Sequence, residues 1–151
     1  MLLDSGLVVN AYRFSKHLPI GHLRFTVERL QELRVDEIII LNSSHSNHPE
    51  MDFEKLSSDF DSWHISTPIA YGGGIMTNAQ AKNIIKKGAD RIVVSAKVLC
   101  NGEELARIGE VLGEQAIILH LPIAMHTSGL KVRDFEDSPL VSIIDMIPLN
   151  W

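Results

Sequence analysis

Short apolar segments alternate with longer amphipathic segments along this chain, and this alternation limits the fold more than any other feature. The segment Glu37–Leu41 (EIIIL) is almost continuously apolar, which is typical of a strand buried on both faces. Strands of this kind occur in parallel sheets that helices cover. The repeated strand–helix order with short connections therefore predicts an α/β fold with parallel strands.

The strand-like and helix-like segments follow one another from near the start of the chain to near its end. The expected strands are Leu7–Phe14, Glu37–Leu41, Ile65–Tyr71, Arg91–Ser95 and Gln115–Leu121, and the expected helices are His22–Leu33, Glu50–Phe60, Asn78–Lys87, Glu103–Leu112 and Pro139–Ile147. A barrel and an open doubly wound sheet both fit this order. The lack of a G-x-G-x-x-G motif and the position of three glycines after the third strand-like segment favour the barrel.

Three consecutive glycines, Gly72–Gly74, separate the strand Ile65–Tyr71 from the next helix. Glycine places no side chain in the way, so the backbone N–H groups can turn toward an anion. Thr77 and Gln80 have the spacing of a capping box, and the following helix would add the positive end of its dipole. This pattern predicts a phosphate-binding site. A tight strand-to-helix turn that binds nothing is the alternative.

Composition sets the broad class of protein. The chain has 151 residues, 45% hydrophobic and 22% charged, which fits a single globular domain over residues 1–151. A net charge of -5 without a basic cluster argues against nucleic-acid binding. No apolar run approaches the roughly 20 residues that span a membrane, and the start lacks a basic leader. With one cysteine, Cys100, we expect no internal disulfide and a soluble, cytoplasmic protein.

Four segments together resemble a known family. VDEIIIL (35–41), PIAYGGGI (68–75), GADRIVVSAKV (88–98) and LGEQAIIL (112–119) are similar, in order and spacing, to the cyclase subunit of imidazole glycerol phosphate synthase. The similarity extends over nearly the whole chain. It is greater for a divergent branch of that family, encoded with lipopolysaccharide amidotransferase genes. The resemblance implies a (β/α)8 TIM barrel made of two fused halves, and histidine biosynthesis as the setting of the ordinary enzyme.

The resemblance also implies the roles of individual residues. Those that would bind phosphate are Gly72, Gly73, Gly74, Ser95 and Ala96, where the family prefers Asn-Thr at the last two positions. The two carboxylates of the cyclase fall at Leu2 and Pro122, whose side chains cannot transfer a proton. No catalytic residue is therefore assigned, and Asp4, the nearest carboxylate, precedes a turn and is judged out of position. His120, at a strand end, is either a base in a repurposed site or a rim histidine.

A complete barrel takes about 250 residues. This chain is shorter, so we expect a partial barrel of (β/α)4–5, a half barrel. Such a half would expose strand edges and an apolar inner face, which predicts a homodimer or a complex with a second half barrel. The resemblance implies a glutamine amidotransferase subunit as a further partner.

Three functions remain open. The first is a divergent protein, non-catalytic or altered, that still binds a phosphorylated small molecule. The second is an active cyclase, a lyase of histidine biosynthesis. The third is an interaction module without a ligand. We expect no cofactor and no metal, since His45 and His48 have ligand spacing but no evident third ligand.

Overall fold

The computed structural model describes residues 1–12, 16–44, 48–60, 62–95, 97–98, 102–127 and 129–132. Predictions for Ala96, Cys100, His45 and the helix Pro139–Ile147 lie outside the described residues.

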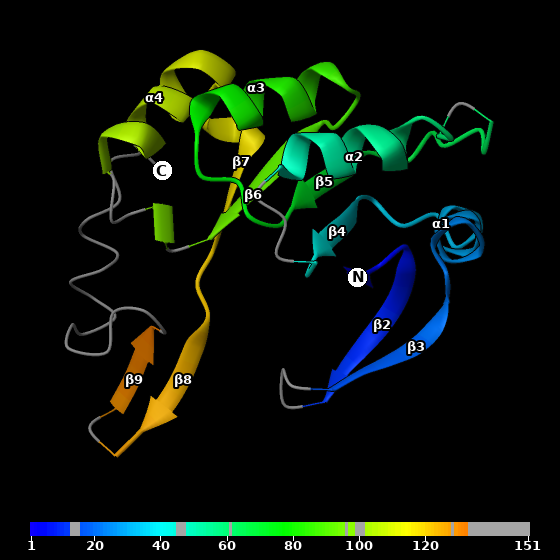
Figure 1. Ribbon diagram of the computed structural model, residues 1–151, viewed down its shortest axis with the longest axis horizontal. Helices are drawn as coiled ribbons and strands as arrows, with labels where there is room; N and C mark the ends of the chain where they lie inside the picture. Colours follow the sequence, from blue (N-terminus) through cyan, green and yellow to red (C-terminus); the bar gives the residue numbers. More distant parts are fainter. Residues whose placement is uncertain are drawn as a thin grey trace.

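A seven-stranded sheet in the order β3-β2-β1-β4-β5-β6-β7 forms the centre of the molecule. Its parallel strands are β1 (Leu2–Asp4), β4 (Ile38–Asn42), β5 (Ile69–Gly72), β6 (Arg91–Ser95) and β7 (Ile117–His120). The helices between them are α1 (Leu23–Glu32), α2 (Pro49–Ser57), α3 (Asn78–Lys86) and α4 (Gly102–Leu112). In Figure 1, α2, α3 and α4 lie together on one side of the sheet. The described strands form an open sheet bounded by β3 and β7, which confirms the predicted partial barrel.

Two antiparallel strands, β2 (Leu7–Tyr12) and β3 (Lys16–His22), extend the sheet beyond β1. Ser5 and Gly6 connect β1 to β2, and both have the positive φ that a type I′ hairpin turn requires. The sequence-based assignment lacked β3. This strand is mostly exposed and contains Pro19, a residue that sheets tolerate at their edges.

A separate hairpin follows the sheet. It consists of β8 (Ile123–His126) and β9 (Gly129–Val132), where the sequence analysis assigned no strand. A short 3-10 turn, η2 (Glu114–Ala116), precedes β7. None of the helices in the described ranges is long and apolar enough to cross a bilayer.

The core lies between the sheet and the helices. On β4, Ile38 and Ile40 are buried against the helices, whereas Ile39, between them, is 37% exposed on the other side. We call that other side the inner face. Because residues in register on parallel strands point to the same side, one row crosses the inner face of all five. Its members are Leu2, Leu41, Gly72, Val93 and Ile118.

Candidate phosphate site

The three glycines lie at the carboxyl end of β5, and we call Gly72–Gly74 the glycine tip. Gly73 and Gly74 have φ values of +135° and +77°, which glycine adopts far more readily than other residues. A Cβ at Gly72 would lie 2.7 Å from Cβ of Val93, and one at Gly73 would lie 2.3 Å from the carbonyl oxygen of Asn42. The first two glycines therefore let β4 and β6 pack closely around β5, whether or not a ligand binds.

The backbone N–H of Gly74 remains available, because none of the hydrogen bonds between described residues uses it. Gly72 is in register with both Leu41 and Val93, so the N–H of Gly73 belongs to the sheet ladder. Gly73 is half-buried and Gly74 is exposed. Successive N–H groups in such unusual conformations form concavities suited to anions. The carboxyl ends of the parallel strands are also where α/β barrels carry their sites.

The amino end of α3 already has partners. The predicted capping box is confirmed: Thr77 Oγ1 accepts from the Gln80 N–H at 3.3 Å, and Gln80 Oε1 accepts from the Thr77 N–H at 3.2 Å. The Asn78 N–H donates to Glu104 Oε1 of α4 at 2.5 Å. Glu104 thus takes the position at this helix end that the sequence reasoning had left for a phosphate. Anion binding would rest on the tip itself.

Ser95 completes the described part of the site. It ends β6, is half-buried, and is in register with His120 at the end of β7. Since Gly72 is in register with Val93, Ser95 lies two residues beyond the point where β5 ends and the glycine tip begins. Adjacent strands are about 4.8 Å apart. The Ser95 hydroxyl and the N–H groups of the tip therefore belong to the same edge of the sheet.

The two positions at which the family's carboxylates were expected lie on the outermost parallel strands. Leu2 is a half-buried residue of β1, and Pro122 lies two residues after the end of β7. His120 is exposed at the end of β7. Neither Leu2 nor Pro122 can exchange a proton with a ligand.

Asp4 has an environment that the sequence did not predict. It ends β1, and its Oδ2 lies 2.6 Å from Nδ1 of His17 on β3. Ser5 Oγ donates to the other carboxylate oxygen at 3.0 Å. His17 had no sequence signal, because its partner is 13 residues away in a segment without regular periodicity.

A polar group beneath the tip joins β4, β5 and α2. Asn42 Nδ2 donates to the hydroxyl of Tyr71 at 3.1 Å and to Asp52 Oδ2 at 3.4 Å. Burial raises the pKa of Tyr71 to about 12, and the nearby Asp52 carboxylate acts in the same direction, while the Asn42 hydrogen bond opposes them. Asn42, whose backbone carbonyl lies beside Gly73, is thus held in place by the hydrogen bonds of its side chain.

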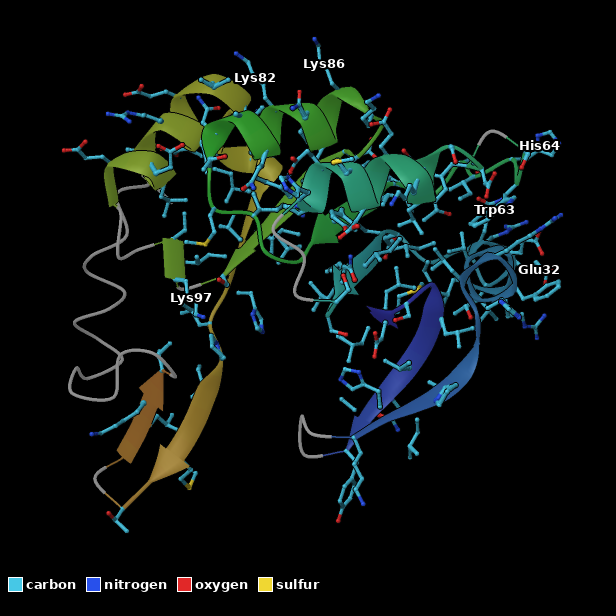
Figure 2. All side chains as sticks on the ribbon, in the orientation of Figure 1. Glu32, Trp63, His64, Lys82, Lys86 and Lys97 are labelled. Atoms are coloured by element: carbon cyan, nitrogen blue, oxygen red, sulfur yellow. The ribbon has the colours of Figure 1, made fainter. Side chains whose placement is uncertain are left out.

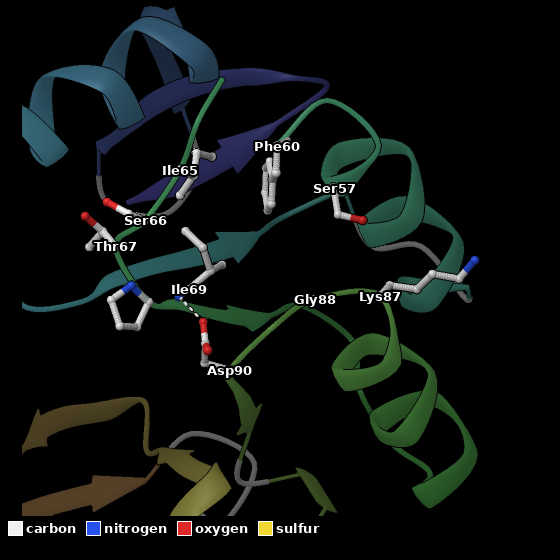
Figure 3. Close-up of a pocket in the computed structure, with 10 residues that line it drawn as sticks. Ser57, Phe60, Ile65, Ser66, Thr67, Ile69, Lys87, Gly88 and Asp90 are labelled. Atoms are coloured by element: carbon white, nitrogen blue, oxygen red, sulfur yellow. Dashed lines mark hydrogen bonds between the residues drawn. The ribbon is translucent and has the colours of Figure 1, made fainter. Parts of the chain in front are cut away.

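A cavity of about 330 Å³ lies at the opposite, amino end of the strands. Figure 3 shows Ser57, Phe60, Lys87 and Asp90 around it. Asp90 Oδ2 accepts from the Ile69 N–H at 2.8 Å, and Lys87 forms an ion pair with Glu54. Ile69, which lines this cavity, begins β5, whereas the glycine tip lies at the other end of β5. The cavity is therefore separate from the glycine tip.

Other candidate residues contribute nothing to the tip. Lys82 and Lys86 extend from α3 away from the sheet in Figure 2. Trp63 packs against Phe60, with ring centroids 5.7 Å apart. Within the described ranges, no three His, Cys, Asp or Glu side chains gather as metal ligands.

The comparisons with known proteins agree with the fold. The family model described as "Histidine biosynthesis protein" matches residues 3–133. A Campylobacter jejuni relative is 30% identical over 144 residues, covering 93% of this chain and 57% of its own length. A Vibrio vulnificus relative is 26% identical over 148 residues, covering 96% and 52%. Both are named, provisionally, imidazole glycerol phosphate synthase subunit hisF2.

A third relative, from Shewanella sp. (strain W3-18-1), is named imidazole glycerol phosphate synthase subunit HisF. It is 26% identical over 135 residues, which cover 88% of this chain and 52% of the relative. The chain spans about half the length of the curated relatives it matches.

Proposed function

This chain belongs to the histidine biosynthesis protein family, and we propose that it binds a phosphorylated small molecule at the glycine tip. The N–H of Gly74 would donate to the phosphate oxygens, and the Ser95 hydroxyl would add a second donor from the neighbouring strand. One observation carries this proposal. The Gly74 N–H lies at the carboxyl edge of the sheet, in a positive-φ conformation, and none of the hydrogen bonds between described residues uses it.

We further propose that the chemistry of the ordinary cyclase is altered or lost. That reaction, as the resemblance implies, needs a proton-transferring carboxylate at the ends of two strands. The resemblance puts Leu2 and Pro122 at the corresponding positions of this chain. A change in pKa cannot compensate, because neither side chain has a proton to give or accept.

An active cyclase is the second candidate, and the names of the relatives favour it, since all three are given as subunits of imidazole glycerol phosphate synthase. Growth of a strain that lacks the cyclase, when supplied with this chain, would support that candidate. We expect no growth. A ligand-free interaction module is the third candidate, and a titration that shows no phosphate binding would favour it.

We propose two protein partners. The open sheet and the apolar inner face would be covered by a second half barrel, either another copy of this chain or a separate one. The relatives are named as subunits, which supports a further partner of the glutamine amidotransferase class.

Calorimetric titration with inorganic phosphate and with glycerol phosphate tests the binding site. Ser95→Asp places a negative charge beside the tip, and we expect it to weaken binding by about tenfold or more. Ser58→Asp is the matched control. It makes the same change at the end of α2, where the Ser58 hydroxyl donates to the backbone carbonyl of Lys55. Gly73→Asp is unsuitable, since any Cβ there would meet the Asn42 carbonyl. Equal affinity in the wild type and both variants would place phosphate elsewhere.

A further inference from the structure

We propose that Asp4 and His17 form an acid–base pair that exchanges a proton with a ligand anchored at the glycine tip. This inference rests on the proposed phosphate site. It assigns proton transfer to His17, positioned by Asp4, and neither residue occupies a position of the family's carboxylates.

The contact has the form of a base held by a carboxylate. Asp4 Oδ2 and His17 Nδ1 are 2.6 Å apart, and the side chains are 33% and 28% exposed. A carboxylate can only accept, so Nδ1 carries the hydrogen and Nε2 is the ring nitrogen left for a ligand. Ser5 Oγ donates to the other oxygen of Asp4, which fixes the carboxylate further. A histidine oriented in this way is a common general base.

The pair lies on the side of the sheet where a ligand would bind. Leu3 faces the core, so its neighbour Asp4 points to the inner face at the carboxyl end of β1. On β2, Val8 faces the core, and Ala11 therefore lies on the inner side; His17 is in register with Ala11 and shares that side. The pair and the glycine tip thus belong to one face.

Strand spacing sets the size of the ligand. His17 belongs to β3, but its ring contacts Asp4 at the end of β1. Only β4 separates β1 from β5, so Asp4 and the glycine tip lie two spacings, or about 10 Å, apart. A phosphate takes up about 3 Å next to its donors, and a base reaches about 3 Å to its proton. The distance that remains between the phosphate and the reacting carbon suits a phosphorylated sugar of four to six carbons, with a carbonyl group near that carbon.

The step is a reversible enolisation. Nε2 of His17 takes the proton from the carbon beside the carbonyl; the C–H bond breaks and its electron pair forms the enolate. The imidazolium then returns a hydrogen to the same carbon. Asp4 stabilises the imidazolium and holds the ring, so it acts as a positioning residue. In D₂O the returned hydrogen is deuterium, which makes the step measurable without a net reaction.

A purely structural role is the alternative. The contact joins β3 to β1 across β2, so it also fastens the outer hairpin. A structural contact would affect the unfolding midpoint and leave deuterium exchange unchanged.

The test is proton NMR of aldose and ketose phosphates of four to six carbons, incubated in D₂O with the full chain. We expect exchange beside the carbonyl, at least about 100-fold slower in His17→Gln and about tenfold slower in Asp4→Asn. His22→Gln, at an exposed histidine of the same strand, is the control and should leave the rate unchanged. Circular dichroism and phosphate affinity should match the wild type in every variant.

Each outcome decides something. Phosphate binding without exchange on any sugar overturns the acid–base pair and leaves the proposed function standing. Exchange that persists in His17→Gln also overturns the pair. Exchange that depends on His17 but is not inhibited by inorganic phosphate supports the pair and contradicts the phosphate site. The absence of both binding and exchange ends both proposals.

Discussion

Asn42 at the end of β4 donates a hydrogen bond to the buried hydroxyl of Tyr71 on β5 at 3.1 Å. The same asparagine presents its backbone carbonyl to Gly73. A core tyrosine therefore holds the strand end against which the glycine tip is packed. Changes in the core at Tyr71 should reach the site through this one residue.

Stability at high pH should depend on Tyr71. Burial raises its pKa from 10 to about 12, so above pH 10 the unfolded chain releases a proton that the folded chain retains. The contribution is complete below pH 10 and is lost as the pH rises through 12. It amounts to about 2 to 3 kcal/mol. Urea unfolding between pH 9 and 11 should show a fall in the wild type that is smaller in Tyr71→Phe.

Tyr12→Phe is the control for this experiment, because Tyr12 is 57% exposed. Its pH profile should match the wild type. A Tyr71→Phe profile as steep as that of the wild type would contradict the assignment.

Two glycines with positive φ should respond very differently to alanine. Gly73→Ala adds both backbone strain and a contact at 2.3 Å with the Asn42 carbonyl, so we expect a loss above about 3 kcal/mol or failure to fold. Gly88→Ala, at φ +105°, adds strain alone, because nothing lies within 4 Å of the new methyl group. Its cost should be about 1 to 2 kcal/mol in urea unfolding. Similar losses in the two variants would refute the close approach of β4.

Glu104 should stabilise the amino end of α3. Glu104→Ala removes the acceptor of the Asn78 N–H, and we expect a cost of about 1 to 2 kcal/mol. Glu103→Ala is the matched control: Glu103 contacts the same arginine, Arg107, but is far more exposed. Its effect should stay within about 0.5 kcal/mol. Thermal or urea unfolding measures both, and equal effects would mean that the helix end does not need this acceptor.

The inner face should mediate association. We expect the wild type to sediment as a dimer at micromolar concentration, because apolar residues such as Ile39 otherwise face water. Ile39→Lys should yield a monomer or abolish folding. Val111→Lys, on the exposed side of α4, should leave the mass unchanged. A wild-type chain that is well folded and monomeric would count against this surface.

Elements whose residues show a clear hydrophobic pattern or clear end signals could be predicted from the sequence. The strand Arg91–Ser95 matches the structure residue for residue, because its apolar run is bounded by the polar residues Arg91 and Ser95. Helix α3 differs by one residue, since the capping box and Gly88 mark its ends. Strand β3 was not predicted, because its residues are mostly exposed and carry no alternation. The hairpin of β8 and β9 was not predicted either, because each strand has only four residues and neither shows a clear alternation of polar and apolar residues.

The site divides in the same way. Three adjacent glycines at a strand end are visible in any reading of the sequence. The contact of Glu104 with Asn78 joins residues 26 positions apart, and that of Asp4 with His17 spans 13. Such pairs depend on which helices and strands become neighbours in space, and no local pattern encodes that.

Pro19 makes one edge of the open sheet, β3, different from the other edge, β7. Its ring removes one backbone donor from β3, and it adjoins a bulge in which Ile20 has no partner between Val8 and Val9 of β2. The four residues of β7 each retain an N–H group. A newly arriving strand would find a continuous ladder beside β7 and a broken one beside β3. Growth of this sheet is therefore one-directional, whichever polypeptide supplies the next strand.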